Sequence, residues 1–374
     1  MKLRVLVLYG GRSREHEVSC LSARSVLAAL DCDRYDVLPV GITREGRWVL
    51  TEGHAETPPG RTLPEVSGDG TTVALVLTRK GPRLVHFDSD DRFEIVSEVD
   101  VAFPVLHGPY GEDGTIQGLF ATLGVPYVGA DVTASSVAID KRAMKSAFKA
   151  RGLPQVPYRP VRCERWSRER DSVVSELEGA LYYPMFTKPA RQGSSIGITK
   201  VWDRRALLDG LQQSFAYDRV AIVEAGIEGV REIEVGVIGN SEPEVTEPGE
   251  VVPTREFYDF EAKYLDAPEL VIPADLPEDL TRRVRDLALE AYQAVGCRGM
   301  ARVDLFLRLG GGGAPYGTGG EAVWVNEINT IPGFTPNSMF PRLWQAQGVS
   351  YPQLVDRLLE LALDAAHQAA RYAP

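Results

Sequence analysis

The stretch Val323–Met339, VWVNEINTIPGFTPNSM, indicates how the rest of the chain is arranged. Val323–Val325 is β-branched and aromatic, which is typical of a buried strand. Glu327 and Asn329 follow two residues apart, so an extended chain points both side chains to the same face. A carboxylate beside an amide oxygen at the end of a buried strand is costly unless something pairs with them. A hard cation such as Mg²⁺ prefers oxygen ligands, so this segment predicts a cation site.

A second strand is expected at Ala301–Leu309, where Arg302 and Asp304 are again two residues apart. The glycine-rich segment Gly310–Gly320 lacks the GK[ST] ending of a P-loop and separates two strands, so we expect it to connect a hairpin. Such a hairpin places Asp304 across from the two polar side chains of the first strand. The alternative is a solvated strand face with an Arg–Asp pair. The apolar neighbours favour burial, and buried like charges need a cation.

Composition limits the class of protein. The 374 residues are enough for two or three domains, and 44% hydrophobic with 25% charged residues is ordinary for a globular protein. The formal net charge of -11 argues against a general nucleic-acid or membrane-surface binder. No apolar run suits a signal peptide or a membrane span. The four cysteines are scattered, which indicates reduced thiols in a cytoplasmic protein.

The first part of the chain predicts a doubly wound α/β unit. A strand at Leu3–Leu8, a helix at Val18–Leu30 and a strand at Tyr35–Ile42 follow in β-loop-α-β order. The stretch Trp48–Thr72 is rich in loops. The remaining expected elements are strands at Val73–Leu77, Val99–Pro104 and Val125–Val128 and a helix at Ile116–Leu123. We place the first domain at residues 1–129.

A central domain is predicted at residues 130–225 and a C-terminal domain at 226–374. The central domain opens with a helix at Ser135–Arg151, with Ser135 or Ser136 as its N-cap and Gly152 at its end. Its other elements are strands at Tyr182–Lys188, Gly197–Val201 and Val220–Glu224 and a helix at Arg204–Gln213. The C-terminal domain adds strands at Glu232–Ile238 and Gly249–Val252, a polar loop at Thr254–Pro273, and helices at Leu280–Val295 and Tyr351–Ala370.

Two segments carry groups that suit a nucleotide. In Lys188–Ile198, KPARQGSSIGI, a lysine ends a strand and a Gly-Ser-Ser turn follows, so backbone N–H groups, hydroxyls and a charge could receive phosphate oxygens. The alternative is an ordinary hairpin turn. Glu224 and Glu232 lie at strand ends near a domain junction, where a carboxylate suits an adenine amino group or a ribose hydroxyl. The alternative for each is a solvated charge.

Further candidates lie in loops. Gly10–Gly11 between strand and helix permits close approach of a ligand but lacks the full dinucleotide fingerprint. Glu15 after it suits an ammonium group, or is a solvated charge, and His16 is a surface or packing residue. His107 in HGPYGEDGT is either a pocket residue or a structural turn residue. The aromatic and charged loop Thr254–Tyr264 is a lid or an anchored surface loop.

Seven motifs, in this order, resemble those of the D-alanine–D-alanine ligase family of the ATP-grasp superfamily. They are GGRSREHEVS, HGPYGEDG, KPARQGSSIGI, REIEVGVIG, EFYDFEAKY, RVDLF and NEINTIPGFTPNSM. The resemblance implies an α/β and α+β fold: an N-terminal Rossmann-like parallel sheet, a central ATP-grasp lid domain and a C-terminal ATP-grasp domain. It also implies ATP-dependent joining of two D-alanines through a D-alanyl phosphate, for peptidoglycan precursor synthesis. D-alanine and ATP are then the partners of a cytoplasmic homodimer.

The resemblance assigns roles to residues of this chain. The metal ligands would be Asp304, Glu327 and Asn329, holding two Mg²⁺ ions, with Mn²⁺ as an alternative and K⁺ as a further candidate. The nucleotide contacts would be Lys141, Lys188, Ser194, Ser195, Glu224, Glu232 and Lys263. The catalytic set, which binds the first D-alanine and the tetrahedral oxyanion, would be Glu15, Ser194, Tyr264, Arg302 and Gly333. The contacts of the second D-alanine would be His107, Lys263, Ser338 and Met339.

Two features depart from the family pattern or bear on specificity. Ala225 occupies a position where many relatives carry lysine near adenine, which leaves a backbone contact there. Tyr264 favours a dipeptide product, since relatives that use D-lactate tend to carry phenylalanine. A D-lactate or D-serine ligase remains the close alternative. A non-catalytic ATP sensor would not need the metal ligands, and an NAD-dependent oxidoreductase has only the opening β-loop-α-β in its favour.

Overall fold

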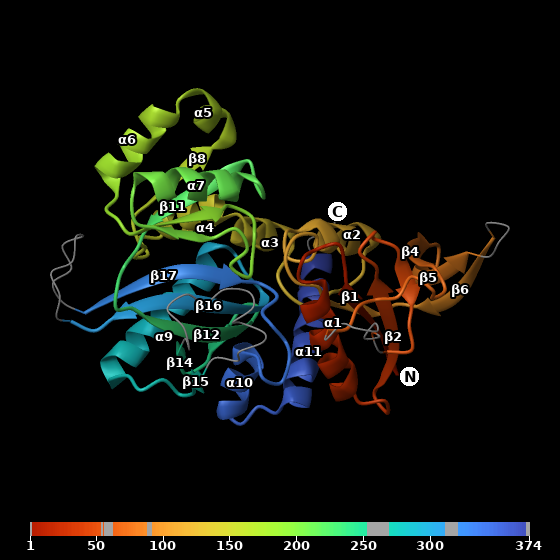
Figure 1. Ribbon diagram of the computed structural model, residues 1–374. Helices are drawn as coiled ribbons and strands as arrows, with labels where there is room; N and C mark the ends of the chain where they lie inside the picture. Colours follow the sequence, from red (N-terminus) through yellow and green to blue (C-terminus); the bar gives the residue numbers. More distant parts are fainter. Residues whose placement is uncertain are drawn as a thin grey trace.

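The computed structural model describes residues 2–53, 55, 63–87, 92–252, 269–310 and 321–371. The described residues form four sheets flanked by helices, and both parallel and antiparallel sheets are present (Figure 1). This confirms the expected mixture of α/β and α+β organisation. Within these residues, no helix combines the length and apolar character needed to cross a membrane. All four cysteines are free thiols, as expected.

The N-terminal sheet is parallel around its central strand. The strand order is β3 (Trp48–Leu50), β2 (Tyr35–Ile42), β1 (Leu3–Gly10) and β7 (Val101–Val105), and only β3 is antiparallel. Residues Val5–Leu8 are fully buried because helix α1 (His16–Ala29) covers a face of β1. The β-loop-α-β prediction is therefore confirmed. The strand predicted at Val125–Val128 is wrong, because only Tyr127 forms a bridge, to Ala102.

A small antiparallel sheet and helix α2 (Thr115–Leu123) complete this region. The sheet consists of β4 (Val73–Thr78), β5 (Gly81–Phe87) and β6 (Phe93–Glu98). The sequence indicated β4 but not the two other strands. Strand β6 is largely exposed, so it lacks the buried apolar face from which a strand is recognised.

The single helix predicted at Ser135–Arg151 is two helices, α3 (Val132–Ile139) and α4 (Lys141–Ala150). Asp140 has an extended backbone (φ -84°, ψ 100°), and its carboxylate accepts the N–H of Arg142 at 2.9 Å and caps α4. Asp131, rather than a serine, caps α3 by accepting the N–H of Ala134 at 2.8 Å. A capping carboxylate in mid-sequence therefore interrupts the helical pattern. Gly152 follows α4 with φ +74°, as a C-terminal glycine should.

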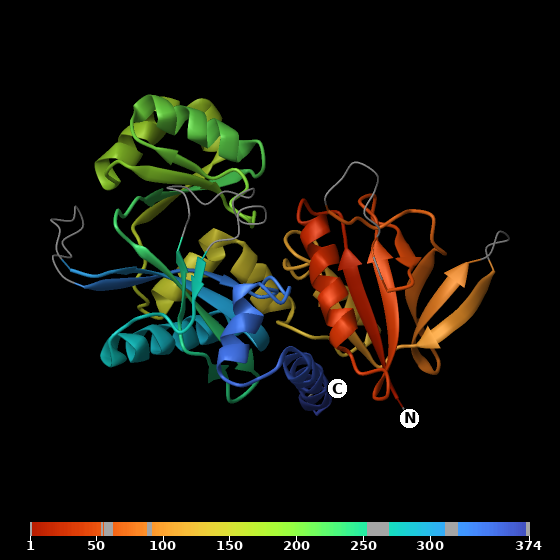
Figure 2. The ribbon, with the colours of Figure 1, turned by 60° about the horizontal axis from the view of Figure 1, so that its bottom comes forward.

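The central antiparallel sheet lies at the top of Figures 1 and 2. Its order is β10 (Thr199–Val201), β9 (Met185–Pro189), β11 (Val220–Ala225) and β8 (Tyr158–Arg162). Its helices are α5 (Cys163–Arg168), α6 (Arg170–Ala180) and α7 (Arg204–Phe215). They share one apolar core with the sheet, to which Leu207, Leu211 and Val223 belong. The order β9, turn, β10, α7, β11 is as predicted, whereas β8, α5 and α6 were not anticipated.

The C-terminal sheet is antiparallel, and its strand β17 carries Glu327 and Asn329. Its order is β15 (Glu269–Val271), β14 (Gly249–Val252), β12 (Arg231–Gly239), β16 (Gly299–Arg308) and β17 (Ala322–Asn329), with β13 (Glu244–Val245) paired to β12. Helices α9 (Glu278–Ala294) and α10 (Met339–Ala346) pack on it. Strand β15 forms within the expected polar loop Thr254–Pro273, of which residues 253–268 lie outside the described residues.

Helix α11 (Tyr351–Ala370), near the C-terminus, packs against the N-terminal part of the chain. It lies beside α1 in Figure 1 and also contacts β7 and β16. Its Leu354 and Leu358 share a core with Val5 and Val7 of β1. The hydroxyl of Tyr35 adds a hydrogen bond to Asp356 at 2.7 Å. The parallel sheet is therefore fixed against the C-terminal sheet, and the loops between them form the candidate site.

Candidate functional site

The hairpin of β16 and β17 forms, and it brings the predicted metal ligands together. Asp304 pairs with Glu327 and Arg302 pairs with Asn329 across the two strands. The register shifts directly after Asp304, which marks a bulge at the polar end of the hairpin. The amide nitrogen of Asn329 donates to the carboxylate of Asp304 at 3.0 Å. The strand spacing therefore predicted this arrangement correctly.

Arg302 lies at the centre of this polar face. Its guanidinium donates to both oxygens of Asp304 at 2.7 Å each, and its Nε lies 2.9 Å from Glu234 on β12. Burial opposes its charge, yet the carboxylates of Asp304 and Glu234 raise the pKa of Arg302. The Arg–Asp pair of the alternative interpretation is present, but Arg302 is only 8% exposed, so the face is not simply solvated.

The oxygen atoms on this polar face are of the kind that a hard divalent cation prefers. Two cationic side chains face the carboxylates here. Arg302 lies against Glu234 and Asp304, and the Nζ of Lys141 lies 3.6 Å from Glu327. Within the described ranges, no three His, Cys, Asp or Glu side chains are grouped closely enough to hold a metal. A cation here needs the amide oxygen of Asn329 as well as carboxylates.

A buried ion-pair triad lies behind this face. The carboxylate of Glu224 on β11 meets Lys145 Nζ at 2.9 Å and Lys188 Nζ at 2.6 Å. Burial alone would raise the pKa of Glu224, but the two lysines lower it to about 2. Burial lowers the pKa of Lys145. Burial also opposes the charge of Lys188, but Glu224 together with Glu327 and Glu232 raises its pKa. The triad therefore holds Glu224 ionised in one position.

Lys145 was not among the predicted site residues. Its signal was the spacing of four between Lys141 and Lys145, which places both on one face of α4. Lys141 Nζ donates to the carbonyl of Gln192 at 2.8 Å, just before the Gly193–Ser195 turn. Glu232 and Glu327 also raise the pKa of Lys188, which places these carboxylates in its surroundings. The predicted nucleotide residues on α4, β9, β11 and β12 thus converge on this polar face of the hairpin.

The Gly193–Ser195 turn contacts the loop between β1 and α1. The hydroxyl of Ser194 donates to the carboxylate of Glu15, which is only 6% exposed. Ser194 and Ser195 have φ of +46° and +58°, unusual for residues with a side chain. A side chain on Gly108 would lie 2.4 Å from Glu15 Oε2, so the glycines of both loops permit the close approach.

Two aromatic contacts add to this junction and were not predicted. The guanidinium of Arg14 lies 4.9 Å from the ring centroid of Tyr217, and that of Arg12 lies 5.4 Å from that of Tyr110. Both tyrosines line a hollow of about 550 Å³ between the N-terminal loops and the central sheet. Arg14 directly precedes Glu15, so its contact with Tyr217 supports the position of that carboxylate.

His107 contacts two other segments of the chain. Its Nδ1 lies 3.0 Å from the carbonyl of Ile331, and its Nε2 lies 3.0 Å from the hydroxyl of Ser22. Glu112 in the same motif was missed. It accepts the N–H groups of Gly108 at 2.5 Å and Ile331 at 3.2 Å. Burial, and then the charge of Glu15, raise the pKa of Glu112 to about 8.

The loop after β17 carries the last predicted residues. Ser338 Oγ accepts the N–H of Thr335 at 3.1 Å, and Ser338 precedes the first residue of α10, Met339. The side chain of Met339 is packed in a core cluster with Val251 and Leu343, which leaves only its backbone N–H for a ligand. Lys263 and Tyr264 lie outside the described residues.

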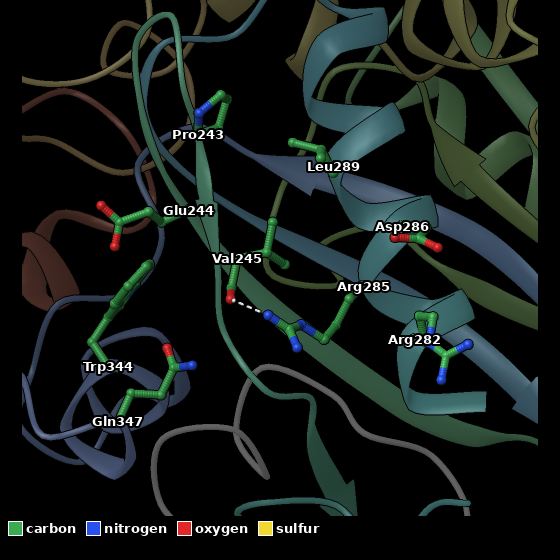
Figure 3. A pocket seen from close by; sticks show the side chains of 9 residues that line it. All are labelled: Pro243, Glu244, Val245, Arg282, Arg285, Asp286, Leu289, Trp344 and Gln347. Atoms are coloured by element: carbon green, nitrogen blue, oxygen red, sulfur yellow. Dashed lines mark hydrogen bonds between the residues drawn. The ribbon is translucent and has the colours of Figure 1, made fainter. Parts of the chain in front are cut away.

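A second hollow of about 550 Å³ lies between α9, α10 and the β12–β13 hairpin (Figure 3). Arg285 donates to the carbonyl of Val245 at 3.2 Å across it. Its lining includes Glu244 and Asp286 as well as arginines, so opposite charges face one another. Among the predicted site residues that the structure describes, none lines this hollow, so it is separate from the site above.

Most of the chain matches two models of one protein family. The family model described as "D-ala D-ala ligase N-terminus" matches residues 4–130, and "D-ala D-ala ligase C-terminus" matches residues 147–360. The D-alanine–D-alanine ligase of Kineococcus radiotolerans is 49% identical over 97% of both chains. That of Streptomyces coelicolor is 45% identical, over 96% of this chain and 93% of its own.

Solved structures agree with the sequence relatives. The D-alanine-D-alanine ligase from Coxiella burnetii has a TM-score of 0.81 at 31% identity, covering 99% of this chain and 97% of its own. VanG D-Ala:D-Ser ligase from Enterococcus faecalis has a TM-score of 0.77 at 32% identity, covering 97% of this chain and all of its own. Both similarities extend over nearly the whole chain, including all four sheets.

Proposed function

Because this chain belongs to the D-alanine–D-alanine ligase family, with its ATP-grasp fold, we propose that it joins two D-alanines at the expense of ATP. The product is D-alanyl-D-alanine, a peptidoglycan precursor, and the intermediate is a D-alanyl phosphate. One observation carries this proposal. The carboxylate of Glu15, the lysines of the buried triad and the carboxylate–amide face of the hairpin converge from three parts of the chain.

In the first step, a carboxylate oxygen of the first D-alanine attacks the γ-phosphorus of ATP, and the bond to ADP breaks. Glu15, oriented by Ser194, would receive the ammonium group of this D-alanine. Lys141 and Lys188 would bind phosphate oxygens, with the Gly193–Ser195 turn above them. A divalent cation held by the hairpin ligands would neutralise the negative charge on the phosphates.

In the second step, the ammonium group of the second D-alanine loses a proton to solvent, and the free amine attacks the acyl phosphate carbon. The nitrogen loses a second proton to solvent as the amide forms. A C–N bond forms, the C–O bond to phosphate breaks, and phosphate leaves. Arg302 and the N–H of Gly333 would stabilise the tetrahedral oxyanion. Ser338 and the N–H of Met339, at the start of α10, would receive the second carboxylate, because a helix N-terminus favours an anion.

Several finer features belong to this proposal. The ligase uses two Mg²⁺ ions, which Mn²⁺ can replace, and K⁺ is a candidate activator. The oxygen-only donor set supports a hard cation. Glu232 binds the ribose, and Glu224 orients the adenine contact. The enzyme is a cytoplasmic homodimer with domains at residues 1–129, 130–225 and 226–374, and sedimentation tests the dimer.

The test is the release of phosphate from ATP and Mg²⁺ with D-alanine, L-alanine or no amino acid. Release that depends on D-alanine is expected, together with a D-alanyl-D-alanine product. Equal release in the three reactions would contradict the proposal. Replacing Mg²⁺ by Mn²⁺, and K⁺ by Na⁺ at constant ionic strength, tests the ion assignments in the same assay.

Because the chain is similar to a D-Ala:D-Ser ligase, D-serine is a second acceptor to be tested. Product analysis with D-alanine and an equal amount of D-serine or D-lactate separates these activities. We expect D-alanyl-D-alanine to dominate, and Tyr264→Phe to loosen this preference because a hydroxyl is lost. An unchanged product ratio in that variant would remove Tyr264 from the specificity assignment.

A further inference from the structure

The loop that follows β17 has an unusual set of backbone hydrogen bonds. Ile331 donates its N–H to Glu112 at 3.2 Å, and Phe334 donates to Ser22 Oγ at 3.3 Å. Pro332 between them has no N–H to donate. The N–H of Gly333 has no acceptor among the described residues. The N–H of Gly333 therefore lies between two N–H groups that donate to side chains of the N-terminal region.

Both polar groups of Ile331 are held from the same turn. Glu112 accepts its N–H, and His107 Nδ1 lies 3.0 Å from its carbonyl oxygen. The other oxygen of Glu112 accepts the N–H of Gly108 at 2.5 Å, which ties the carboxylate into the turn. The turn and the loop are more than two hundred residues apart in the chain. This contact is therefore a tertiary clamp on the loop.

We propose that Glu112 is a positioning residue for the second chemical step, holding Ile331 so that the Gly333 N–H, two residues along, points at the tetrahedral oxyanion. The inference rests on the proposed function, which gives Gly333 its role. Glu112 itself touches no reacting atom. It acts because an oxyanion donor must lie within hydrogen-bond distance of where the charge develops. A displacement of about 1 Å in such a group lowers the rate by about 100-fold.

The structure provides a matched control in the same turn. Asp113 also accepts two backbone N–H groups, from Tyr110 and Thr115, at 2.9 Å each. Both of those bonds stay within the turn, whereas one of the two bonds of Glu112 crosses to Ile331. Asp113→Ala therefore reports the cost of loosening the turn, and Glu112→Ala reports the same cost plus loss of the clamp.

The experiment measures kcat, the KM for ATP, and the inhibition constant of a phosphinate dipeptide analogue, whose tetrahedral phosphorus mimics the addition intermediate. For Glu112→Ala we expect kcat and phosphinate affinity to fall together by about 100-fold, with the KM for ATP within about threefold. Asp113→Ala should leave both quantities within about threefold. Glu112→Gln, which keeps the shape, should lie between them, since its amide oxygen still accepts from Ile331.

The outcomes separate the two levels of the proposal. A parent enzyme without D-alanine-dependent phosphate release would overturn the proposed function and the inference with it. An active parent whose Glu112→Ala and Glu112→Gln variants behave like Asp113→Ala would overturn the inference alone. A loss of kcat without loss of phosphinate affinity would do the same. If Glu112→Ala does not fold, Glu112→Gln decides by the same two quantities.

Discussion

The ion-pair triad of Lys145, Glu224 and Lys188 predicts a large and pH-dependent contribution to stability. Glu224→Gln keeps the size of the side chain but removes the charge that two ammonium groups face at 2.9 and 2.6 Å. The carboxylate and Lys145 are almost completely buried, so water cannot replace the lost partner. We therefore expect the variant to unfold at a lower denaturant concentration than the parent.

The magnitude follows from the pKa of Glu224. The two lysines lower it from the ordinary 4.5 to about 2. At about 1.4 kcal/mol per pKa unit, ionised Glu224 contributes about 3 kcal/mol to the free energy of unfolding at neutral pH. Removal of one partner from a buried pair independently costs about 3–5 kcal/mol. Glu224→Gln is therefore expected to lower the free energy of unfolding by about 3 kcal/mol.

The contribution of Glu224 to stability is lost on acidification. A carboxyl with a lowered pKa in the folded state binds fewer protons there than in the unfolded state. Its contribution is complete above pH 4.5 and is lost as the pH falls through the folded pKa near 2. The stability difference between parent and Glu224→Gln should therefore be constant from pH 7 down to about 5 and shrink below 4.5.

Urea unfolding followed by tryptophan fluorescence measures this difference. The matched control is Glu176→Gln, which breaks an exposed pair with Arg165 and should change stability little. A Glu224→Gln variant as stable as the Glu176→Gln control at pH 7 would refute the reasoning. So would a difference that grows on acidification, because the triad would then not be ionised as described.

Three further variants test the site. Glu327→Gln should lower turnover by orders of magnitude with an unchanged circular dichroism spectrum; near-normal activity would contradict its metal role. Gly108→Ala places a methyl group 2.4 Å from Glu15 Oε2 and should abolish most phosphate release. The control is Gly124→Ala, which has a similar φ but open space around the added methyl group, and it should remain active. Equal activities of the two variants would exclude the steric reason. Arg14→Ala should raise the KM for the first D-alanine about threefold by losing the Tyr217 contact, and an unchanged KM would show that the contact is unimportant.

Local patterns predicted the elements that bury one regular face. Helix α11 has the predicted bounds, Tyr351–Ala370, because its apolar residues recur at helical spacing behind a capping serine. Strands β16 and β17 were found from their apolar runs, and their spacing of two put the polar side chains on one face. Exposed strands such as β6 and the break at Asp140 were missed, because no buried face marks the first and a single capping carboxylate decides the second.

The sequence by itself determined which groups meet on a shared element. Asp304, Glu327 and Asn329 lie within one hairpin, so strand periodicity was sufficient to bring them together. The tertiary structure alone decided the partners that come from distant parts of the chain. In the sequence, Lys145 is an ordinary helical lysine, and only the tertiary structure packs Glu224 against it. Glu112 is likewise an ordinary turn carboxylate in the sequence, and only the tertiary structure brings it to the N–H of Ile331. Burial and its electrostatic consequences depend on neighbours that short-range spacing does not specify.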